Sequence, residues 1–323
     1  MTAGPARLRL RVRAVTWEAE GILGYELVPA DATHALPRFE AGAHLDLVLG
    51  NGLVRSYSLL NDPAETHRYC IAVNRDANSR GGSAWVHDAL HAGRVIEADA
   101  PRNHFPLVED AAHTVLIAGG IGITPILSMV RRLAALGRPW TLHYATRTRA
   151  ACAFATELAA LAESSGGALD LRFDAEPGAS MLDLGAIVAA LPPAAHAYCC
   201  GPASMLAAFE SACEGLARER VHVEYFAAKD APATAGGFEV KLARDGRSVA
   251  VREGQSILDA LLALGIMHPN SCREGVCGTC EAKVLAGAPD HRDLVLSDAE
   301  RAANDRMLIC CSGSLGPSLV LDL

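Results

Sequence analysis

Four cysteines in the C-terminal third constrain this chain more than any other feature. They follow the spacing Cys272-x4-Cys277-x2-Cys280, and Cys310 comes after 29 intervening residues. A C-x4-C-x2-C run with a distant fourth cysteine is the ligand spacing of plant-type [2Fe–2S] clusters. The glycines inside the run let the backbone fold tightly and direct N–H groups at the sulfurs. The spacing therefore predicts a [2Fe–2S] cluster held by these four thiolates.

Two questions stay open at this site. A structural zinc site would favour a second short C-x2-C or H-x3-H pair, whereas the returning segment here is a lone "CCS". Cys310 and Cys311 are adjacent, and consecutive side chains of an extended chain point to opposite faces, so only one of them can be the ligand. The spacing favours Cys310, which leaves Cys311 packed as a small hydrophobe.

Length, charge and cysteine usage exclude several classes of protein. A chain of 323 residues is too long for one ordinary domain. It has no apolar run of about 18 residues, which predicts no membrane span, and no secretory signal is evident at the N-terminus. The net charge of −8 argues against a nucleic-acid partner. Ten cysteines, five of them between Cys272 and Cys311, indicate metal or redox chemistry in a cytoplasmic protein.

The texture of the sequence changes along the chain and predicts three domains. Residues 1–105 contain short alternating runs punctuated by Gly, Asn and Pro, which indicates an antiparallel β-barrel. Residues 106–227 alternate apolar strands with amphipathic helices, as in an α/β domain with a parallel sheet. Residues 228–237 are small, polar and Gly/Pro-containing, and are predicted to form a linker. Residues 238–323 then form the α+β domain that carries the cysteines.

Two motifs in the first domain predict a flavin. The first is "RSYS", made of Arg55, Ser56, Tyr57 and Ser58. Its ring could lie against an isoalloxazine while its polar groups reach phosphate and flavin atoms. The second is "RGGS", made of Arg80, Gly81, Gly82 and Ser83. Here the glycines allow close backbone approach, and the serine opens a helix whose N–H groups favour a phosphate.

Two motifs in the second domain predict a dinucleotide site. "AGGIGITP" follows an apolar strand and precedes a helix, so that its glycines form a turn where a pyrophosphate could lie. "YCCGP" ends a later strand in the same manner and would place the Cys200 thiol at the same edge of the sheet. The candidate residues of these two turns are Gly119, Gly120, Gly122, Thr124, Cys200, Gly201 and Pro202.

Taken in order, "RSYS", "RGGS", "GGIGITP", "CCGP" and the cysteine run resemble the phthalate dioxygenase reductase family, which includes vanillate O-demethylase reductases. The resemblance covers essentially the whole chain, including "DHRD" at Asp290–Asp293. It implies an FMN barrel, an NAD domain and a C-terminal ferredoxin domain of the β-grasp type. It also implies an NADH-dependent, monomeric reductase that serves a Rieske-type non-haem iron oxygenase acting on an aromatic acid.

The resemblance also implies roles for particular residues. The FMN phosphate would be bound by "RGGS", and the flavin would be contacted by Arg55, Ser56, Thr124 and the segment Ala72, Val73 and Asn74. Phe226 would cover the flavin, and hydride transfer would take place among Thr124, Cys200 and Phe226. NADH delivers two electrons together whereas the cluster accepts one at a time, so the flavin must lie between them.

The nucleotide donor and the electron acceptor each leave an alternative. NADH is favoured, with Asp174 or Glu176 as possible ribose partners, although Arg147 and Arg149 could accept a 2′-phosphate. The acceptor could instead be a P450 or a diiron hydroxylase. A third hypothesis, outside the redox enzymes, is a zinc-stabilised binding protein without catalytic activity.

Overall fold

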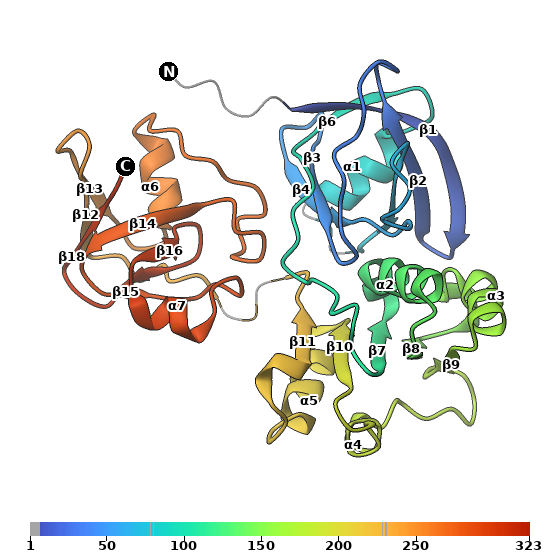
Figure 1. The fold of residues 1–323 in the computed structure, drawn as a ribbon. Coiled ribbons are helices and arrows are strands. Elements are labelled where there is room, and N and C mark those ends of the chain that lie inside the picture. The colour runs from blue at the N-terminus through green and yellow to red at the C-terminus, as the bar shows by residue number, and fades with distance from the viewer. Residues whose placement is uncertain (1–6, 78, 80, 228, 230) are drawn as a thin grey trace. The chain divides into compact units, whose positions relative to one another are not determined.

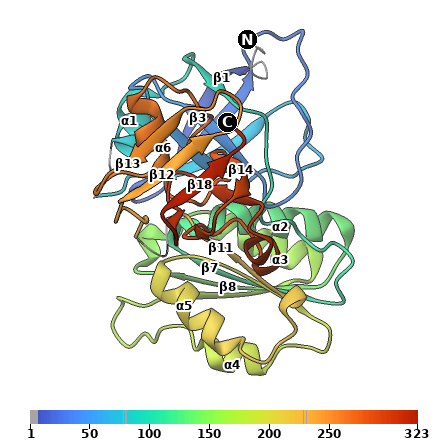
Figure 2. The same cartoon turned by 90° about the vertical axis from the view of Figure 1, so that its left-hand side faces the viewer.

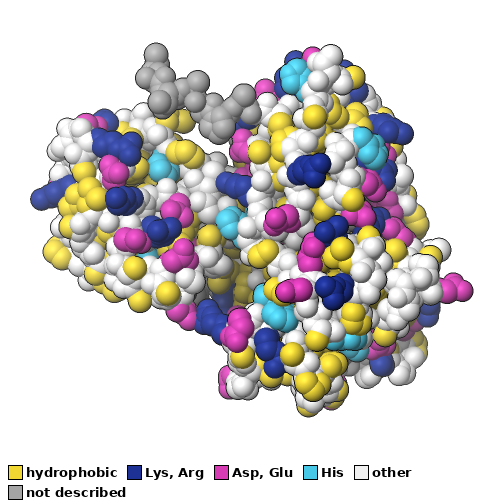
Figure 3. Space-filling view, viewed as in Figure 1, with side chains coloured by type: hydrophobic (Ala, Val, Ile, Leu, Met, Phe, Trp, Pro, Cys, Tyr) yellow, Lys and Arg dark blue, Asp and Glu magenta, His cyan; other side chains and the backbone are white. Residues whose placement is uncertain are grey.

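The computed structural model describes residues 7–77, 79, 81–227, 229 and 231–323, which form two compact units. The N-terminal unit is Met1–Glu224 and the C-terminal unit is Tyr225–Leu323 (Figure 1). Within the described ranges, no helix has the length and apolar character needed to cross a membrane. On the face seen in Figure 3, basic and acidic side chains are interspersed.

An antiparallel sheet forms the first half of the N-terminal unit, in the order β4-β3-β6-β1-β2-β5. Its strands are β1 (Leu8–Ala19), β2 (Ile22–Pro29), β3 (His44–Val48), β4 (Val54–Ser58), β5 (Tyr69–Asn74) and β6 (Val95–Ala98). The edge strands β4 and β5 approach each other. Leu10 and Val12 are buried while Arg11 between them is exposed, which is the alternation expected of a one-sided sheet. Helix α1 (Gly82–Ala89) lies between β5 and β6 in the chain and contacts β5.

A parallel sheet in the order β11-β10-β7-β8-β9 forms the second half. Its strands are β7 (Thr114–Gly119), β8 (Trp140–Thr146), β9 (Ala168–Phe173), β10 (His196–Cys200) and β11 (Val221–Glu224). The helices are α2 (Ile123–Leu136), α3 (Ala155–Ser165), α4 (Leu184–Ala189) and α5 (Ala203–Ala212). Helices α2 and α3 cover one face of the sheet, and α4 and α5 cover the other (Figures 1 and 2).

The strand order creates a switch point beside β7. The chain runs outward through β8 and β9, then crosses to the other side of β7 to form β10 and β11. Ligands of open α/β sheets bind at such a point, outside the carboxyl ends of the strands. A 3-10 turn, Gly120–Gly122, occupies this position between β7 and α2.

The two sheets of the N-terminal unit share one hydrophobic core. Ala72 and Phe105 from the antiparallel half belong to the same cluster as Leu116 and Ile123 from the parallel half. Polar contacts cross the same boundary: the Ser128 hydroxyl donates to the Asn61 carbonyl at 3.0 Å. The shared core joins the predicted flavin and nucleotide halves, while the predicted boundary at residues 105–106 remains a prediction.

The C-terminal unit is an α+β fold around a mixed sheet in the order β13-β12-β18-β14-β16. The strands are β12 (Phe238–Leu242), β13 (Ser248–Val251), β14 (Glu281–Ala286), β16 (Arg306–Leu308) and β18 (Ser318–Leu321). The central pair, β12 and β18, is parallel and the other pairs are antiparallel. Smaller elements are β15 (Pro289–Asp290), β17 (Gly313–Ser314), α6 (Ile257–Ala263) and α7 (Asp298–Ala303). The segment between α6 and β14 contains Cys272, Cys277 and Cys280, three of the four predicted cluster ligands.

Leu116→Ala should destabilise the N-terminal unit, because Leu116 is fully buried on the central strand β7 in the shared core. We expect a loss of about 2–5 kcal/mol in the free energy of unfolding. Urea denaturation followed by tryptophan fluorescence measures it, because Trp17, Trp85 and Trp140 all lie in this unit. The control is Leu136→Ala at the end of α2, where the side chain is 39% exposed. Equal losses in both variants would contradict the shared core.

Candidate functional site

The glycine turn after β7 and the turn after β10 are in direct contact. A Cβ atom on Gly122 would lie 2.2 Å from the Cys200 carbonyl oxygen, and one on Gly119 would lie 2.6 Å from the Pro202 ring. Neither position has room for a side chain. Because β7 and β10 are parallel neighbours with Ala118 opposite Cys200, both turns end at the same edge of the sheet. The structure thus brings together the two motifs that the sequence pairs.

Thr124 and Cys200 are buried beside these turns. The Thr124 hydroxyl donates to the Ile121 carbonyl at 3.1 Å, which ties the start of α2 to the glycine turn. Cys200 is completely buried, and its thiol donates to Oε2 of Glu224 at 3.9 Å. Burial raises the pKa of this thiol well above its usual value, so Cys200 is held as a neutral thiol.

Glu224 is a candidate residue that the sequence did not single out. It is the last residue of β11, and the parallel register of β10 and β11 places it directly opposite Cys200. Desolvation raises the pKa of Glu224 to about 8, the largest effect, and the hydrogen bond from Cys200 opposes it. Perturbed carboxyl groups of this kind cluster at functional sites. Phe226, which is 42% exposed, follows two residues later at the start of the C-terminal unit.

The four residues of "RSYS" divide between the two faces of β4. Ser56 lies opposite Asp46 and donates its hydroxyl to that buried carboxylate at 2.6 Å, and Ser58 follows on the same face. Asp46 also pairs with Arg102. Tyr57 packs against the core of the antiparallel sheet, and burial raises its pKa. The serine hydroxyl that the sequence assigns to the flavin therefore already has a protein partner.

Arg55 and the "RGGS" turn are adjacent, which fits a phosphate. A Cβ atom on Gly82 would lie 2.6 Å from Nε of Arg55. Gly81 has φ of 88°, and α1 begins at Gly82. A guanidinium beside a helix N-terminus combines two features that bind phosphate. Arg80, which the sequence also assigns to this site, lies outside the described residues.

The other predicted flavin and phosphate residues lie on neighbouring elements. Ala72 and Val73 are buried in β5 while Asn74 is exposed at its end, and Ala72 belongs to the shared core beside the glycine turn of β7. The Ser83 hydroxyl accepts a hydrogen bond from the Asp76 backbone N–H at 3.2 Å. The two predicted motifs and the glycine turn therefore line one region of the N-terminal unit.

The four predicted cluster ligands occur as two pairs of thiols. Interaction with Cys272 lowers the pKa of Cys277, and interaction with Cys280, followed by that with Cys311, lowers the pKa of Cys310. The Cys272 backbone N–H donates to the Cys277 sulfur at 3.5 Å. Backbone N–H groups also face the sulfurs: the Glu274 N–H donates to Cys272 at 3.3 Å. A two-iron cluster needs two thiolates on each iron, so this donor set fits it.

The zinc alternative would need four ligands around one centre. Among residues 7–77, 79, 81–227, 229 and 231–323, no three His, Cys, Asp or Glu side chains are grouped closely enough to hold one metal ion. This finding applies to the four cysteines under either interpretation and does not separate them.

Cys311 occupies a different environment from Cys310. Its thiol faces the Leu308 carbonyl at 3.7 Å, and a Cβ atom on Gly275 would lie 2.5 Å from its sulfur. Gly275 has φ of 71°, a left-handed conformation that glycine adopts without strain. Cys310 is the member of the adjacent pair that contacts Cys280. The geometry therefore favours Cys310 as the fourth ligand.

Comparison with known proteins gives the family. Residues 116–211 match the "Oxidoreductase NAD-binding domain" and residues 240–313 match the "2Fe-2S iron-sulfur cluster binding domain". The chain is 58% identical to "Phenoxybenzoate dioxygenase subunit beta" of Ectopseudomonas oleovorans, over 98% of both chains. It resembles the solved structure of phthalate dioxygenase reductase with a TM-score of 0.74 and 38% identity, over 98% of both chains. The chain belongs to the phthalate dioxygenase reductase family.

A further solved structure extends the likeness to fused proteins. An intact type IV self-sufficient cytochrome P450 monooxygenase matches with a TM-score of 0.87 and 37% identity, over 98% of this chain and 41% of that one. Membership of the family makes this chain an electron-transfer oxidoreductase with FMN, NADH and a [2Fe–2S] cluster as its redox groups.

Glu224→Gln should flatten part of the pH dependence of stability. The pKa of Glu224 is about 8 in the folded chain against an ordinary 4.5, so the folded state resists ionisation of this group. Its contribution is fully present below about pH 4.5 and is lost as the pH rises through about 8. Over this window the wild-type free energy of unfolding should fall more steeply than that of the variant. Urea denaturation at several pH values, followed by tryptophan fluorescence, measures both slopes.

The matched control for this prediction is Glu219→Gln, because Glu219 is exposed in the segment that leads into β11. It should leave the slope unchanged. Parallel slopes for wild type and Glu224→Gln would show that the Glu224 carboxyl group is not held in a neutral form by the fold.

Proposed function

We propose that this chain is the reductase component of a Rieske-type oxygenase or O-demethylase acting on an aromatic acid, and that it works as a monomer. The observation that supports the proposal is the presence in one chain of two contacting glycine turns at a sheet edge, the Arg55 guanidinium beside the start of α1, and four cysteines with [2Fe–2S] spacing. Relatives over the full length include a phenoxybenzoate dioxygenase subunit, vanillate O-demethylase oxidoreductases and a phthalate dioxygenase reductase. These names support an aromatic oxygenase as the acceptor.

When bound, FMN takes the two electrons that NADH delivers as a hydride and passes them on singly to the cluster. The protein's part at the nucleotide site is to admit and orient the dinucleotide. Gly119, Gly122 and Gly201 let the two turns pack against each other, whereas Gly120 faces open space where a pyrophosphate could approach the backbone. Cys200 and Glu224 would line the nicotinamide position as neutral groups, because burial disfavours the charge of each. Thr124 fixes the start of α2 at this edge.

At the flavin site, some residues are proposed to bind the FMN phosphate and another to stack on the flavin ring. Arg55, with the first-turn N–H groups of α1, would hold the FMN phosphate, since a cation and a helix N-terminus meet there. Gly81 and Gly82 keep the turn open to a close ligand. Phe226 would cover the flavin ring, as the family resemblance implies, and its exposed side chain is available for stacking.

The loops after β8 and β9 bear on the choice between NADH and NADPH. Arg149 stacks on Phe173 with 4.3 Å between its guanidinium carbon and the ring centre, and its backbone N–H donates to Glu176 at 3.0 Å. This arginine therefore has an intramolecular role that does not require a 2′-phosphate. The acidic side chain of Glu176, in the loop after β9, therefore lies beside Arg149, where it would repel a 2′-phosphate. We propose NADH as the donor on this basis.

A P450 is the second candidate acceptor. It is favoured by the 37% identity between nearly the whole of this chain and part of a self-sufficient P450 monooxygenase. The same three-part module can thus be joined to a haem partner. Both acceptors would take electrons from the same cluster, so an experiment that offers each of them to the reductase is needed to separate the two candidates.

Anaerobic addition of NADH to the purified holoprotein should bleach both the flavin and the iron–sulfur absorption, and NADPH should do so much more slowly. A Rieske-type oxygenase and a P450 are then offered as acceptors in parallel, and the rate of reduction of each is measured by its own spectrum. Faster reduction of the Rieske centre supports the proposal. Transfer to the haem alone would favour the second candidate, and bleaching by NADPH alone would reverse the choice of donor.

Cys310→Ala and Cys311→Ala should differ in cluster content, because Cys310 contacts Cys280 while Cys311 packs against Gly275. We expect Cys310→Ala to lose iron and acid-labile sulfide, and Cys311→Ala to keep both. Flavin content serves as the control for the N-terminal unit, since Arg55 and the "RGGS" turn, which are proposed to bind the FMN phosphate, lie there. Loss of the cluster in Cys311→Ala with retention in Cys310→Ala would reverse the assignment of the fourth ligand.

A further inference from the structure

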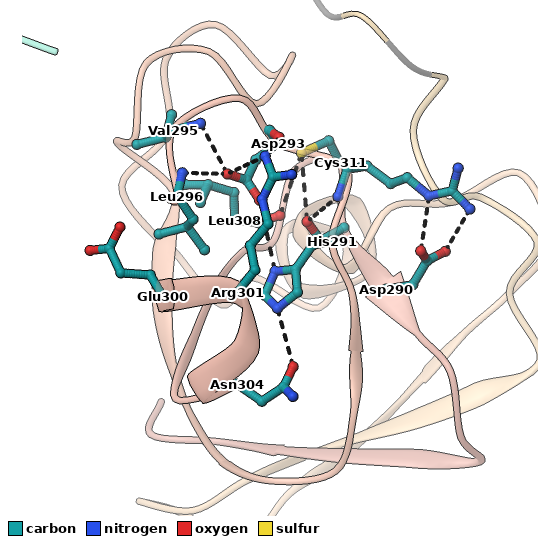
Figure 4. A network of polar contacts seen from close by, with 12 residues as sticks. Asp290, His291, Asp293, Val295, Leu296, Glu300, Arg301, Asn304, Leu308 and Cys311 are labelled. Carbon is teal, nitrogen blue, oxygen red and sulfur yellow. Dashed lines mark hydrogen bonds and ion pairs between the residues drawn. The ribbon is translucent and has the colours of Figure 1, made fainter. Parts of the chain in front are cut away.

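A fully buried carboxylate lies beside the cluster loop. The Asp293 side chain has no exposed area, and its Oδ1 atom accepts hydrogen bonds from the backbone N–H groups of Val295 at 3.0 Å and Leu296 at 2.8 Å (Figure 4). Its Oδ2 atom is buried and has no hydrogen-bond partner among the described residues. This carboxylate belongs to "DHRD", a segment to which the proposed function assigns no role.

Gly275 connects Asp293 to the proposed fourth ligand. The Gly275 carbonyl accepts from the Leu294 N–H at 2.9 Å, and interaction with the Gly275 backbone contributes to lowering the pKa of the Cys310 thiol. A Cβ atom on Gly275 would lie 3.0 Å from Cα of Asp293 and 2.5 Å from the Cys311 sulfur. Gly275 thus lies between Asp293 and the Cys310 thiol, and the Cys311 thiol also packs against Gly275.

Two cationic or polar groups partly offset the Asp293 charge. The Arg301 guanidinium donates to the Asp293 backbone carbonyl and lies 4.0 Å from Oδ1. Nδ1 of His291 lies 3.8 Å from Oδ2. The arginine is one-third exposed whereas the carboxylate is fully buried, so solvent screens the cation more than the anion. Charges act strongly on one another in such a poorly solvated interior.

We propose that Asp293 is a positioning residue for the [2Fe–2S] cluster, whose buried negative charge lowers the cluster's reduction potential while Arg301 raises it. The inference rests on the proposed cluster ligands. Reduction adds one electron, supplied through the flavin, and neither makes nor breaks a bond in the protein. A fixed negative charge beside Gly275 disfavours that added electron, because the potential of a cluster follows the charge and hydrogen bonds around it. The reduced cluster is thereby a stronger donor to the next acceptor.

The test is a spectroelectrochemical titration of the cluster in four forms of the holoprotein. Asp293→Asn keeps an oxygen that can accept from Val295 and Leu296 but removes the charge, and its potential should rise. Arg301→Gln removes the opposing charge, and its potential should fall. Asp290→Asn is the matched control: it makes the same chemical change three residues earlier, where the carboxylate pairs with Arg292 at 3.0 Å, and it should shift the potential least.

Iron and sulfide content is measured first, because it separates failure of the proposed function from failure of the proposed role of Asp293. Wild-type protein without a cluster would overturn the proposed function. A loaded Asp293→Asn variant with an unchanged potential, or a shift matched by Asp290→Asn, would overturn this inference alone. Should Asp293→Asn fail to hold the cluster, Arg301→Gln decides: a lowered potential supports the electrostatic role, and an unchanged or raised one contradicts it.

Discussion

The backbone contact between Gly122 and the Cys200 carbonyl is the constraint on which the nucleotide site depends. Two parallel strands that end in glycine turns can approach until only hydrogen atoms separate their backbones. Any side chain at Gly122 would force the turns apart, although its φ of −60° is open to every residue. The requirement here is steric, unlike the requirement at Gly275, where the left-handed conformation and the Cys311 sulfur both exclude a side chain.

The sequence predicted best those features whose chemistry is local. The cysteine spacing indicates a cluster because ligand spacing along the chain directly limits the geometry of the ligands. The glycine turns were also predicted, since a strand, a turn and a helix are consecutive in the chain. The three fold classes follow for the same reason: alternation with period two or 3.6 records which face of each element is buried. Family membership and the sheet topologies confirm them.

Sequence reasoning missed residues whose role depends on a partner across a strand. Glu224 gains its raised pKa only because the register of β11 sets it opposite Cys200. The assignment of Ser56 to the flavin stays a prediction, and the pairing of β3 with β4 adds a partner that the sequence does not show, because the Ser56 hydroxyl donates to Asp46. Register cannot be read from one strand alone. A more useful signal would have been an acidic residue at the carboxyl end of the strand that precedes Phe226.

Glu224, which is half-buried, and Asp293, which is buried, differ in the groups that surround their carboxyl oxygens. The hydrogen-bond partner of Glu224 is the neutral Cys200 thiol, so desolvation favours the uncharged form of this carboxyl group beside the position proposed for the nicotinamide. Asp293 is offered two backbone N–H donors and a neighbouring guanidinium, which are groups that solvate an anion. A neutral lining suits hydride transfer because it leaves the developing charge to the cofactors. A charged lining suits a one-electron centre because it sets how readily that electron leaves.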